Sequence, residues 1–341
     1  MLISVTRGTR KSDIMRSSTI YIIRRIVFAI AVIFAIIIFN FIIFRLLPGN
    51  PIDVLYGGKI LTPQQMKMLY QQFGLNQPMW LQILIYIKNT LTGNLGISYT
   101  YSLPVSSILF NAIINSLILG TPALIFAILI GMWTGKIAGW KRNSQIDNVV
   151  TNISMILWSI PAYWLGTLLI LLVMKTGIIP VSGMFTIGTI YPNFISELFD
   201  VLKHLFLPLI TLTLVTFGSY TLIMRNSLLD VFDEDYILTA RAKGVPEKVV
   251  LNKHAVPNAR LPIVSMIAIH FGYLVGGLVL IETVFSWPGI GYTIYQAILN
   301  RDYPLLQGAF LIIAISVVLA NFVADLIYLY LDPRIKYEKF K

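Results

Sequence analysis

Residues 26–47 read IVFAIAVIFAIIIFNFIIFRLL, an apolar run that only Asn40 and Arg45 interrupt. A helix rises 1.5 Å per residue, so about 20 apolar residues cross the roughly 30 Å hydrocarbon core of a bilayer. The run exceeds the roughly 7 to 15 apolar residues of a secretory signal peptide, and no small-residue cleavage site follows it. It therefore predicts a membrane-spanning helix rather than a cleaved leader.

Five further runs of this kind follow along the chain. They cover residues 113–137, 149–174, 205–224, 261–281 and 306–331. The chain of 341 residues is 57% hydrophobic and 12% charged, with a mean hydropathy of +0.78. Because average proteins carry roughly a quarter of charged residues, these values exclude an ordinary soluble globule. We predict an all-α polytopic membrane protein with six transmembrane helices.

The basic residues are unevenly distributed over the predicted loops. With six spans both termini lie on one side, and 19 of the 26 Lys and Arg residues fall on that side against 7 on the other. Since loops rich in Lys and Arg stay in the cytoplasm, we expect both termini to be cytoplasmic. The net charge of +11 then reflects membrane orientation, and we expect no nucleic-acid partner. The chain has no cysteine, which excludes disulfides and thiolate chemistry.

The segments outside the spans suggest the domain organisation. We expect a cytoplasmic N-terminal segment 1–25, the first span 26–47, an extracytoplasmic loop subdomain 48–112, a core of five helices 113–331 with a cytoplasmic loop 226–260, and a cytoplasmic tail 332–341. In the subdomain, Thr62-Pro63-Gln64-Gln65 is the sequence of a capping box and predicts a short helix. A second helix is expected from 78 to 91. This subdomain either caps the bundle or docks an external partner, and both interpretations stay open.

The cytoplasmic loop 226–260 is the most informative stretch. Acidic residues at Glu234 and Asp235, basic residues at Arg241 and Lys243 and a following Gly244 are the order that a short helix favours. We predict a helix from 234 to 243 and a second one from 246 to about 256, ending before Pro257. Small side chains at Ala240 and Ala242, beside Tyr236, permit the close approach of another surface. A merely structural hairpin is the alternative.

This loop resembles the coupling loop of the permeases of binding-protein-dependent ABC importers, and in particular the oligopeptide/dipeptide/nickel family. The residues that match that family's pattern are Asp235, Tyr236, Thr239, Ala240, Arg241, Ala242, Lys243 and Gly244, with His254, Asn258, Ala259 and Pro262 downstream. The resemblance extends from about residue 20 to the C-terminus. Other family-like segments are Leu47 to Pro51, Phe73 to Leu75, Gly93 to Ser98, Ser159 to Gly166, Pro180 to Gly183, Glu282 to Gly291 and Asn300 to Pro304.

The resemblance implies the fold of a type I ABC importer permease and a role as one half of a translocation pore. The long loop after the first span is similar to that of the first of the two permeases in such systems. The implied partners are a second homologous permease, two cytoplasmic ABC ATPases, an extracytoplasmic substrate-binding protein and the lipid of a prokaryotic cytoplasmic membrane. Glu234 to Gly244 would form the coupling helix that enters a groove of an ATPase.

The resemblance also implies that the chain has no catalytic site and no metal or other cofactor of its own. ATP and magnesium would be bound by the ATPase subunits. In agreement, the chain contains no Gly-x4-Gly-Lys-[Ser/Thr] phosphate-binding loop.

A few further residues are candidates outside the loop. Trp287-Pro288-Gly289 and Asp302-Tyr303 would lie in an outer turn that docks a partner or gates the pore. For His270, in the fifth predicted span, a packed and hydrogen-bonded histidine is favoured over a transport site. Asp325 is expected to pair with a neighbouring helix. Gly131, Gly135 and Gly139 have the spacing of a close helix contact.

Two other classes could also have six spans. A secondary transporter would bind coupling ions near the midplane through carboxylates, and no midplane carboxylate or internal repeat is evident. A membrane enzyme would need a cluster of His, Asp, Glu or Ser that this sequence lacks. Within the favoured class, peptides are the expected substrate, oligosaccharides are the alternative and nickel is the least favoured. Asn50 and Asn94 stand where the family often has Asp, a departure that bears on the substrate and not on the family.

Overall fold

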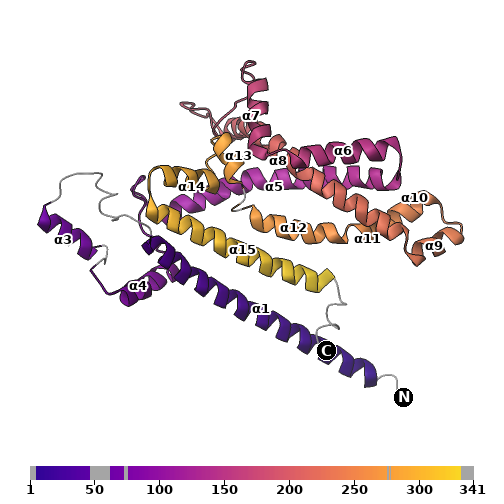
Figure 1. Cartoon of the computed structure of the whole chain (residues 1–341), viewed down its shortest axis with the longest axis horizontal. Helices are drawn as coiled ribbons and strands as arrows, with labels where there is room; N and C mark the ends of the chain where they lie inside the picture. Colours follow the sequence, from indigo (N-terminus) through magenta and orange to yellow (C-terminus); the bar gives the residue numbers. More distant parts are fainter. Residues whose placement is uncertain (1–4, 47–61, 73–75, 275, 277, 332–341) are drawn as a thin grey trace. The chain divides into compact units, whose positions relative to one another are not determined.

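The structure, a computed structural model, describes residues 5–46, 62–72, 76–274, 276 and 278–331, and its regular elements are helices (Figure 1). The longer ones are α1 (Val5–Leu46), α3 (Pro63–Gln72), α4 (Met79–Leu91), α5 (Val105–Trp140), α6 (Gln145–Ser159), α7 (Ala162–Val173) and α8 (Phe194–Phe232). After α8 come α9 (Asp235–Ala242), α10 (Glu247–Val249), the π-helix η1 (Val250–Ala255), α11 (Val256–Ala259), α12 (Leu261–Tyr273), α13 (Val279–Val284), α14 (Ile290–Leu299) and α15 (Tyr303–Leu331). The prediction of an all-α protein is confirmed.

Four helices of the described chain are long and apolar enough to cross a membrane. They are Ile22–Leu46 within α1, all of α5, all of α8 and Tyr303–Val323 within α15. They coincide with the first, second, fourth and sixth predicted spans. The bent pair of α6 and α7 would be a fifth span if counted as one. The structure therefore shows a membrane protein with four or five candidate spans.

The third predicted span, 149–174, is not one straight helix. α6 and α7 meet at an angle of 97° across Ile160 and Pro161. Ile160 is extended, with φ −72° and ψ 128°, and Pro161 precedes the first residue of α7. The residue before a proline is driven out of the helical region by a clash with the proline ring, and proline donates no N–H. Hydropathy alone does not register this break.

The fifth predicted span, 261–281, is shorter than predicted. α12 ends at Tyr273, and α13 begins only at Val279. Two adjacent glycines, Gly276 and Gly277, lie in the interval. Each glycine in a helix interior costs about 1 kcal/mol relative to alanine, so a continuous helix is disfavoured there. The 13 residues of α12 fall short of the roughly 20 needed to span a bilayer.

Chain packing divides the protein into two units, the first comprising Met1–Asn111 and Thr293–Lys341 and the second Ala112–Tyr292. In the first unit α1 packs against α15, where Arg25 and Asp325 form an ion pair of 2.9 Å. The expectation that Asp325 pairs with a neighbouring helix is confirmed. Asn40, which also lies in α1, donates a hydrogen bond of 3.0 Å to the hydroxyl of Tyr86 in α4.

The two helices predicted in the subdomain 48–112 are present as α3 and α4. Thr62 and Gln65 form the predicted capping box, with the Thr62 N–H 2.9 Å from Oε1 of Gln65 and the Gln65 N–H 3.3 Å from Oγ1 of Thr62. Residues 47–61, 73–75 and 332–341 lie outside the described residues. The predicted tail and the family-like segments Leu47 to Pro51 and Phe73 to Leu75 fall there.

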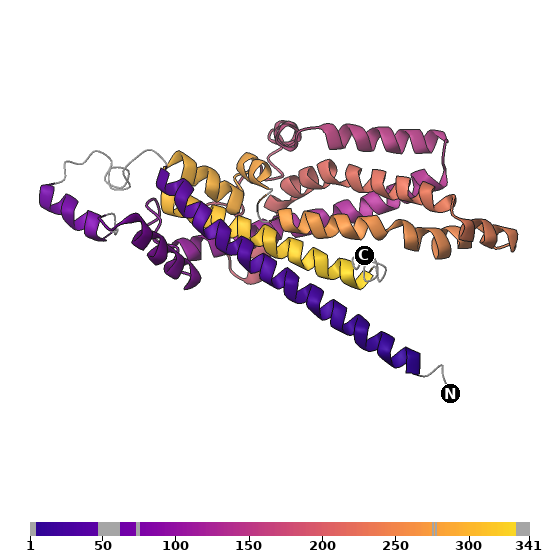
Figure 2. The ribbon, with the colours of Figure 1, turned by 60° about the horizontal axis from the view of Figure 1, so that its bottom comes forward.

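The second unit is built around α5, α6 and α8. Figures 1 and 2 both show α6 lying along α8, with α9 to α11 at the C-terminal end of α8. The glycines of α5 face α8: a Cβ at Gly131 would lie 2.5 Å from Cβ of Tyr220, and one at Gly135 would overlap the carbonyl oxygen of Thr221. The predicted close contact is confirmed, because only glycine lets these two backbones approach so closely.

Candidate functional site

The predicted coupling segment folds as α9, and the chain around it explains its limits. Glu234 is the extended N-cap, Asp235 lies in the first turn and Arg241 in the last, in the order that the helix dipole favours. At the other end Gly244 has φ +77°, and its N–H donates to the carbonyl of Arg241 at 2.9 Å. The N–H of Val245 donates to the carbonyl of Ala240 at 3.3 Å. These two bonds form a Schellman cap, for which glycine is the favoured residue.

Two side chains attach α9 to the rest of the second unit. Ile237 is fully buried and Ala240 is nearly so. Both belong to a hydrophobic cluster that includes Met224 and Leu228 of α8 and Leu251 of η1. A helix of eight residues is marginal in water by itself, so this burial is what stabilises it. Ala240 therefore packs inward, whereas the prediction had it among the small side chains that permit a partner to approach.

The opposite side of α9 is open to solvent. Asp235, Leu238, Thr239 and Ala242 follow the spacing i, i+3, i+4, i+7 of one helix face, and all four are exposed. We call these four residues the α9 face. Leu238 is 53% exposed. The α9 face thus combines one large apolar side chain with small and polar ones, and the described part of the chain leaves it uncovered.

The flanks of α9 are held by polar contacts. Arg241 binds Glu247 through two nitrogens, at 2.9 and 3.2 Å, and its guanidinium lies 5.4 Å from the ring centroid of Phe232. Tyr236, 40% exposed, accepts a hydrogen bond of 2.9 Å from Asn258. Lys243, the C-cap, is exposed. The charge of Arg241 is thus matched within the loop, whereas Lys243 stays available to a partner.

The second predicted helix of the loop does not end before Pro257. It continues from α10 through the π-helix η1 into α11, where Pro257 occupies a first-turn position. The N–H of Val256 bonds to the carbonyl of Leu251, five residues earlier. Proline is tolerated there because the first-turn N–H groups of a helix need no intrahelical partner. The prediction of the helix end was wrong for this reason.

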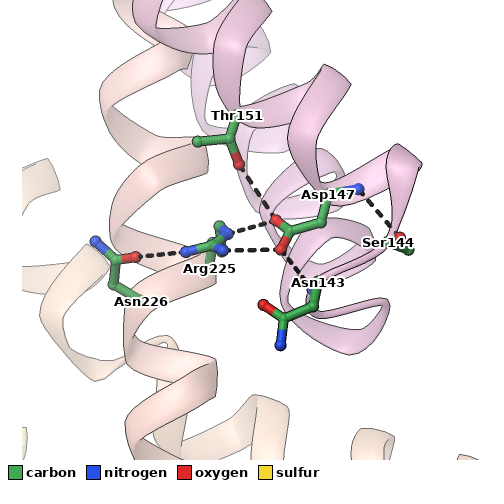
Figure 3. Close-up of polar contacts among 6 residues, drawn as sticks. All are labelled: Asn143, Ser144, Asp147, Thr151, Arg225 and Asn226. Atoms are coloured by element: carbon green, nitrogen blue, oxygen red, sulfur yellow. Dashed lines mark hydrogen bonds and ion pairs between the residues drawn. The ribbon is translucent and has the colours of Figure 1, made fainter.

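A buried ion pair lies near the end of α8 that leads to α9, and the sequence analysis did not predict it. Asp147, at the start of α6, is 1% exposed and binds Nε and Nη2 of Arg225 in α8 at 2.5 and 2.8 Å (Figure 3). The same carboxylate accepts from the N–H of Asn143 at 3.0 Å and from Oγ1 of Thr151 at 3.3 Å. Sequence offered only a weak signal, because the two residues are 78 positions apart.

The candidate turn around Trp287 is buried rather than open. Trp287 and Gly289 are buried, and the indole Nε1 of Trp287 donates to the carbonyl of Asn115 at 2.8 Å. The Asn115 side chain donates in turn to the carbonyl of Pro288 at 2.9 Å. These contacts fix the turn against α5 within the second unit.

Glu282 lies at the centre of the same turn and is fully buried. Its carboxylate accepts hydrogen bonds from Oγ of Ser116 at 2.6 Å and from the N–H groups of Gly291 and Tyr292 at 2.7 and 3.2 Å. The carboxylate thereby caps the N-terminus of α14. A Cβ at position 289 would overlap it, which explains the glycine there.

Asp302, in the first unit, is also buried. It accepts from Oγ of Ser98, from the N–H of Thr100 at 3.0 Å and from the N–H of Leu305 at 3.2 Å. The family-like segments 93–98 and 300–304 therefore meet at this carboxylate. Tyr303 beside it is half-buried. Burial, with a smaller contribution from Asp302, raises the pKa of Tyr99 to about 12, so that phenol stays neutral at any physiological pH.

His270 has the partner that the sequence interpretation favoured. Its Nδ1 and the hydroxyl of Tyr220 share a hydrogen bond of 2.8 Å, and the two rings meet edge to face. His270 also lines a mainly apolar cavity of about 140 Å³ with Thr216 and Leu274. Within the described residues no group of three or more His, Asp or Glu side chains could hold a metal ion.

Long apolar helices define the class of an integral membrane protein, and the short capped helix α9 presents an exposed face beside them. The chain belongs to the family described as binding-protein-dependent transport system inner membrane component, which matches residues 127–337. The N-terminal part of such components matches residues 19–113. It is thus a multi-pass membrane permease.

Named relatives match over nearly the whole chain. The dipeptide transport system permease protein DppB of Alkalihalophilus pseudofirmus is 36% identical over 331 residues, which cover 93% of this chain and 99% of the relative. DppB of Escherichia coli K12 is 34% identical, with 94% and 99% covered. The oligopeptide transport system permease protein AppB of Bacillus subtilis is 34% identical, with 93% and 99% covered.

Proposed function

We propose that the chain is the permease subunit of an ATP-driven importer of dipeptides or oligopeptides. It would form half of a pore with a second, homologous permease, and receive substrate from an extracytoplasmic binding protein. The names of the relatives support peptides as the substrate. In this proposal the chain itself has no catalytic site, and ATP and magnesium act in two cytoplasmic ATPase subunits.

The observation that carries the proposal is the shape of α9. Two buried side chains and a Schellman cap hold it in place, while the α9 face of Asp235, Leu238, Thr239 and Ala242 remains exposed. A short, firmly held helix with one free face can enter a groove of a partner and transmit a displacement. We infer that the α9 face, with Glu234, Tyr236 and Lys243 at its margins, contacts the ATPase.

The proposed topology has six crossings with both termini in the cytoplasm. The bent pair α6 and α7 would be the third crossing, and α12 together with the residues up to α13 the fifth. The excess of Lys and Arg on the segments of one side supports this orientation. It places α9 in the cytoplasm, and it places on the outer side both the turn with Trp287, Pro288 and Gly289 and the segment with Asp302 and Tyr303.

The test is uptake by the complete transporter in lipid vesicles, with its second permease, ATPases and binding protein. Wild type should take up dipeptides or oligopeptides only with ATP, and neither oligosaccharides nor nickel ions should be accumulated. Leu238→Asp places a charge on the α9 face and should abolish both uptake and substrate-stimulated ATP hydrolysis. Lys248→Asp, on exposed α10, is the matched control and should leave both intact. Uptake at the same rate without ATPase subunits would overturn the proposal in favour of a secondary transporter.

A further inference from the structure

The ion pair between Asp147 and Arg225 joins the first turn of α6 to the C-terminal part of α8, just before the loop that carries α9. Arg225 lies about two helical turns before the end of α8 at Phe232, and α9 begins three residues after that end. Met224 and Leu228, on either side of Arg225 in sequence, belong to the cluster that buries Ile237 of α9. A displacement of α9 therefore acts on this part of α8 as well as on η1.

The carboxylate of Asp147 is saturated. Two nitrogens of Arg225, the N–H of Asn143 and the hydroxyl of Thr151 all donate to it (Figure 3). Asn143 adopts a left-handed backbone with φ +61°, and Ser144 caps α6 by accepting from the N–H of Asp147 at 3.3 Å. Such a bidentate, fully bonded pair fixes the angle as well as the distance between two helices. These bonds thus hold the N-terminus of α6 rigidly against the C-terminal part of α8. We call this junction the corner.

The two helices stay in contact beyond this corner. A Cβ at Gly218 of α8 would overlap the carbonyl oxygen of Ser154 in α6, so the backbones touch at that level as well. α6 then leads directly into the 97° elbow and α7. The pair opposes a sliding of α6 along α8, because such a movement would break both of its bonds. Without it, α6 and α8 would still pack along their length, including at Gly218, but no bidentate bond would set their relative orientation at the loop end.

We propose that Asp147 and Arg225 are positioning residues that make α6 and its elbow follow α8 when the partner ATPases displace α9. The inference rests on the proposed function. Apolar residues of similar size often replace a buried ion pair at no cost in stability, so stability alone does not account for a charged pair at this point. What the apolar replacement lacks is a fixed relative orientation of the two helices.

The experiment measures peptide taken up per ATP hydrolysed by the complete transporter in vesicles. The double variant Asp147→Leu/Arg225→Met removes both charges and leaves neither unpaired. It should assemble and hydrolyse ATP, and the ratio of uptake to hydrolysis should fall at least about fivefold, the lower end of usual coupling between sites. The matched control is Arg142→Gln/Asp233→Asn, which removes an exposed pair of 3.8 Å near the same corner and should leave the ratio unchanged.

An unchanged ratio in the double variant would overturn the inference, and so would an equal fall in the control. If the double variant does not assemble, Arg225→Lys decides instead. Lysine keeps the charge but cannot bind a carboxylate through two fixed nitrogens, so the ratio should again fall, and an unchanged ratio would count against the pair. Failure of the proposed function itself is distinguishable, because wild type would then show no ATP-driven peptide uptake.

Discussion

The α9 site and the turn around Glu282 both match family patterns in sequence, yet the structure uses them in opposite ways. α9 is bound to its own chain by the buried side chains of Ile237 and Ala240, a glycine cap and polar contacts at its flanks, and it presents a free face. In the turn, Glu282 and Trp287 are fully buried and backbone N–H groups point at a carboxylate. The first arrangement leaves side chains available to a partner, whereas the second holds helices of the same chain together.

The comparison predicts the largest effect for glutamate replacement in the turn. Glu282→Ala would leave the Ser116 hydroxyl and two N–H groups buried without an acceptor, and each orphaned group costs about 1–3 kcal/mol. We expect unfolding free energy in detergent to fall by about 3–5 kcal/mol. Glu234→Ala, at the exposed N-cap whose side chain makes no capping bond, is the matched control and should change it by less than about 0.5 kcal/mol. Equal losses of unfolding free energy in the two variants would contradict the distinction between the buried turn and the exposed α9 site.

Within α9 the buried and exposed sides should separate stability from coupling. Ile237→Ala removes a fully buried side chain and should cost about 2–4 kcal/mol, seen as faster hydrogen exchange of α9 amides. Leu238→Ala on the α9 face should leave exchange unchanged and still lower substrate-stimulated ATP hydrolysis. If the two variants behaved alike, α9 would have no free docking face.

Replacing a glycine by alanine should destabilise the protein in both regions, but for different reasons. Gly289→Ala would press a methyl group into the Glu282 carboxylate and should cost about 1–3 kcal/mol, the usual range for overpacking. Gly244→Ala meets no atom within 4 Å and would suffer only from its φ of +77°, a cost of roughly 1–2 kcal/mol. Thermal unfolding of both variants gives the ranking, and a larger loss at position 244 would contradict it.

The smallest effect is expected at the exposed ion pair beside α9. Glu247→Gln removes the negative charge and one of the two oxygens that accept from Arg241, and exposed pairs contribute about 0–1 kcal/mol. Unfolding should therefore change by less than about 1 kcal/mol at low salt and still less at high salt. A loss as large as that of Glu282→Ala would show that the loop is held by charge rather than by burial.

Local features were predictable from the sequence because their causes are local. The capping box of Thr62 and Gln65, the extent of α9 up to Gly244 and the close contact of Gly131 and Gly135 all follow from residue types at short spacing. Pro161 is visible in the sequence as a residue that interrupts helices. The hydrophobic run 149–174 was nevertheless predicted as one span that continues through it. A sum of hydropathies counts apolar residues and takes no account of a missing N–H.

The sequence by itself determined that this is an α-helical membrane protein of a known permease family, and it determined where α9 begins and ends. Composition, the order of charges and a glycine just after the last turn of a helix are all properties of the chain read in order. The tertiary structure alone decided that Ala240 faces inward, that Glu282 caps α14 and that Asp147 finds Arg225 from 78 positions away. Partners of buried charges are chosen by packing between distant helices, and no local pattern specifies them.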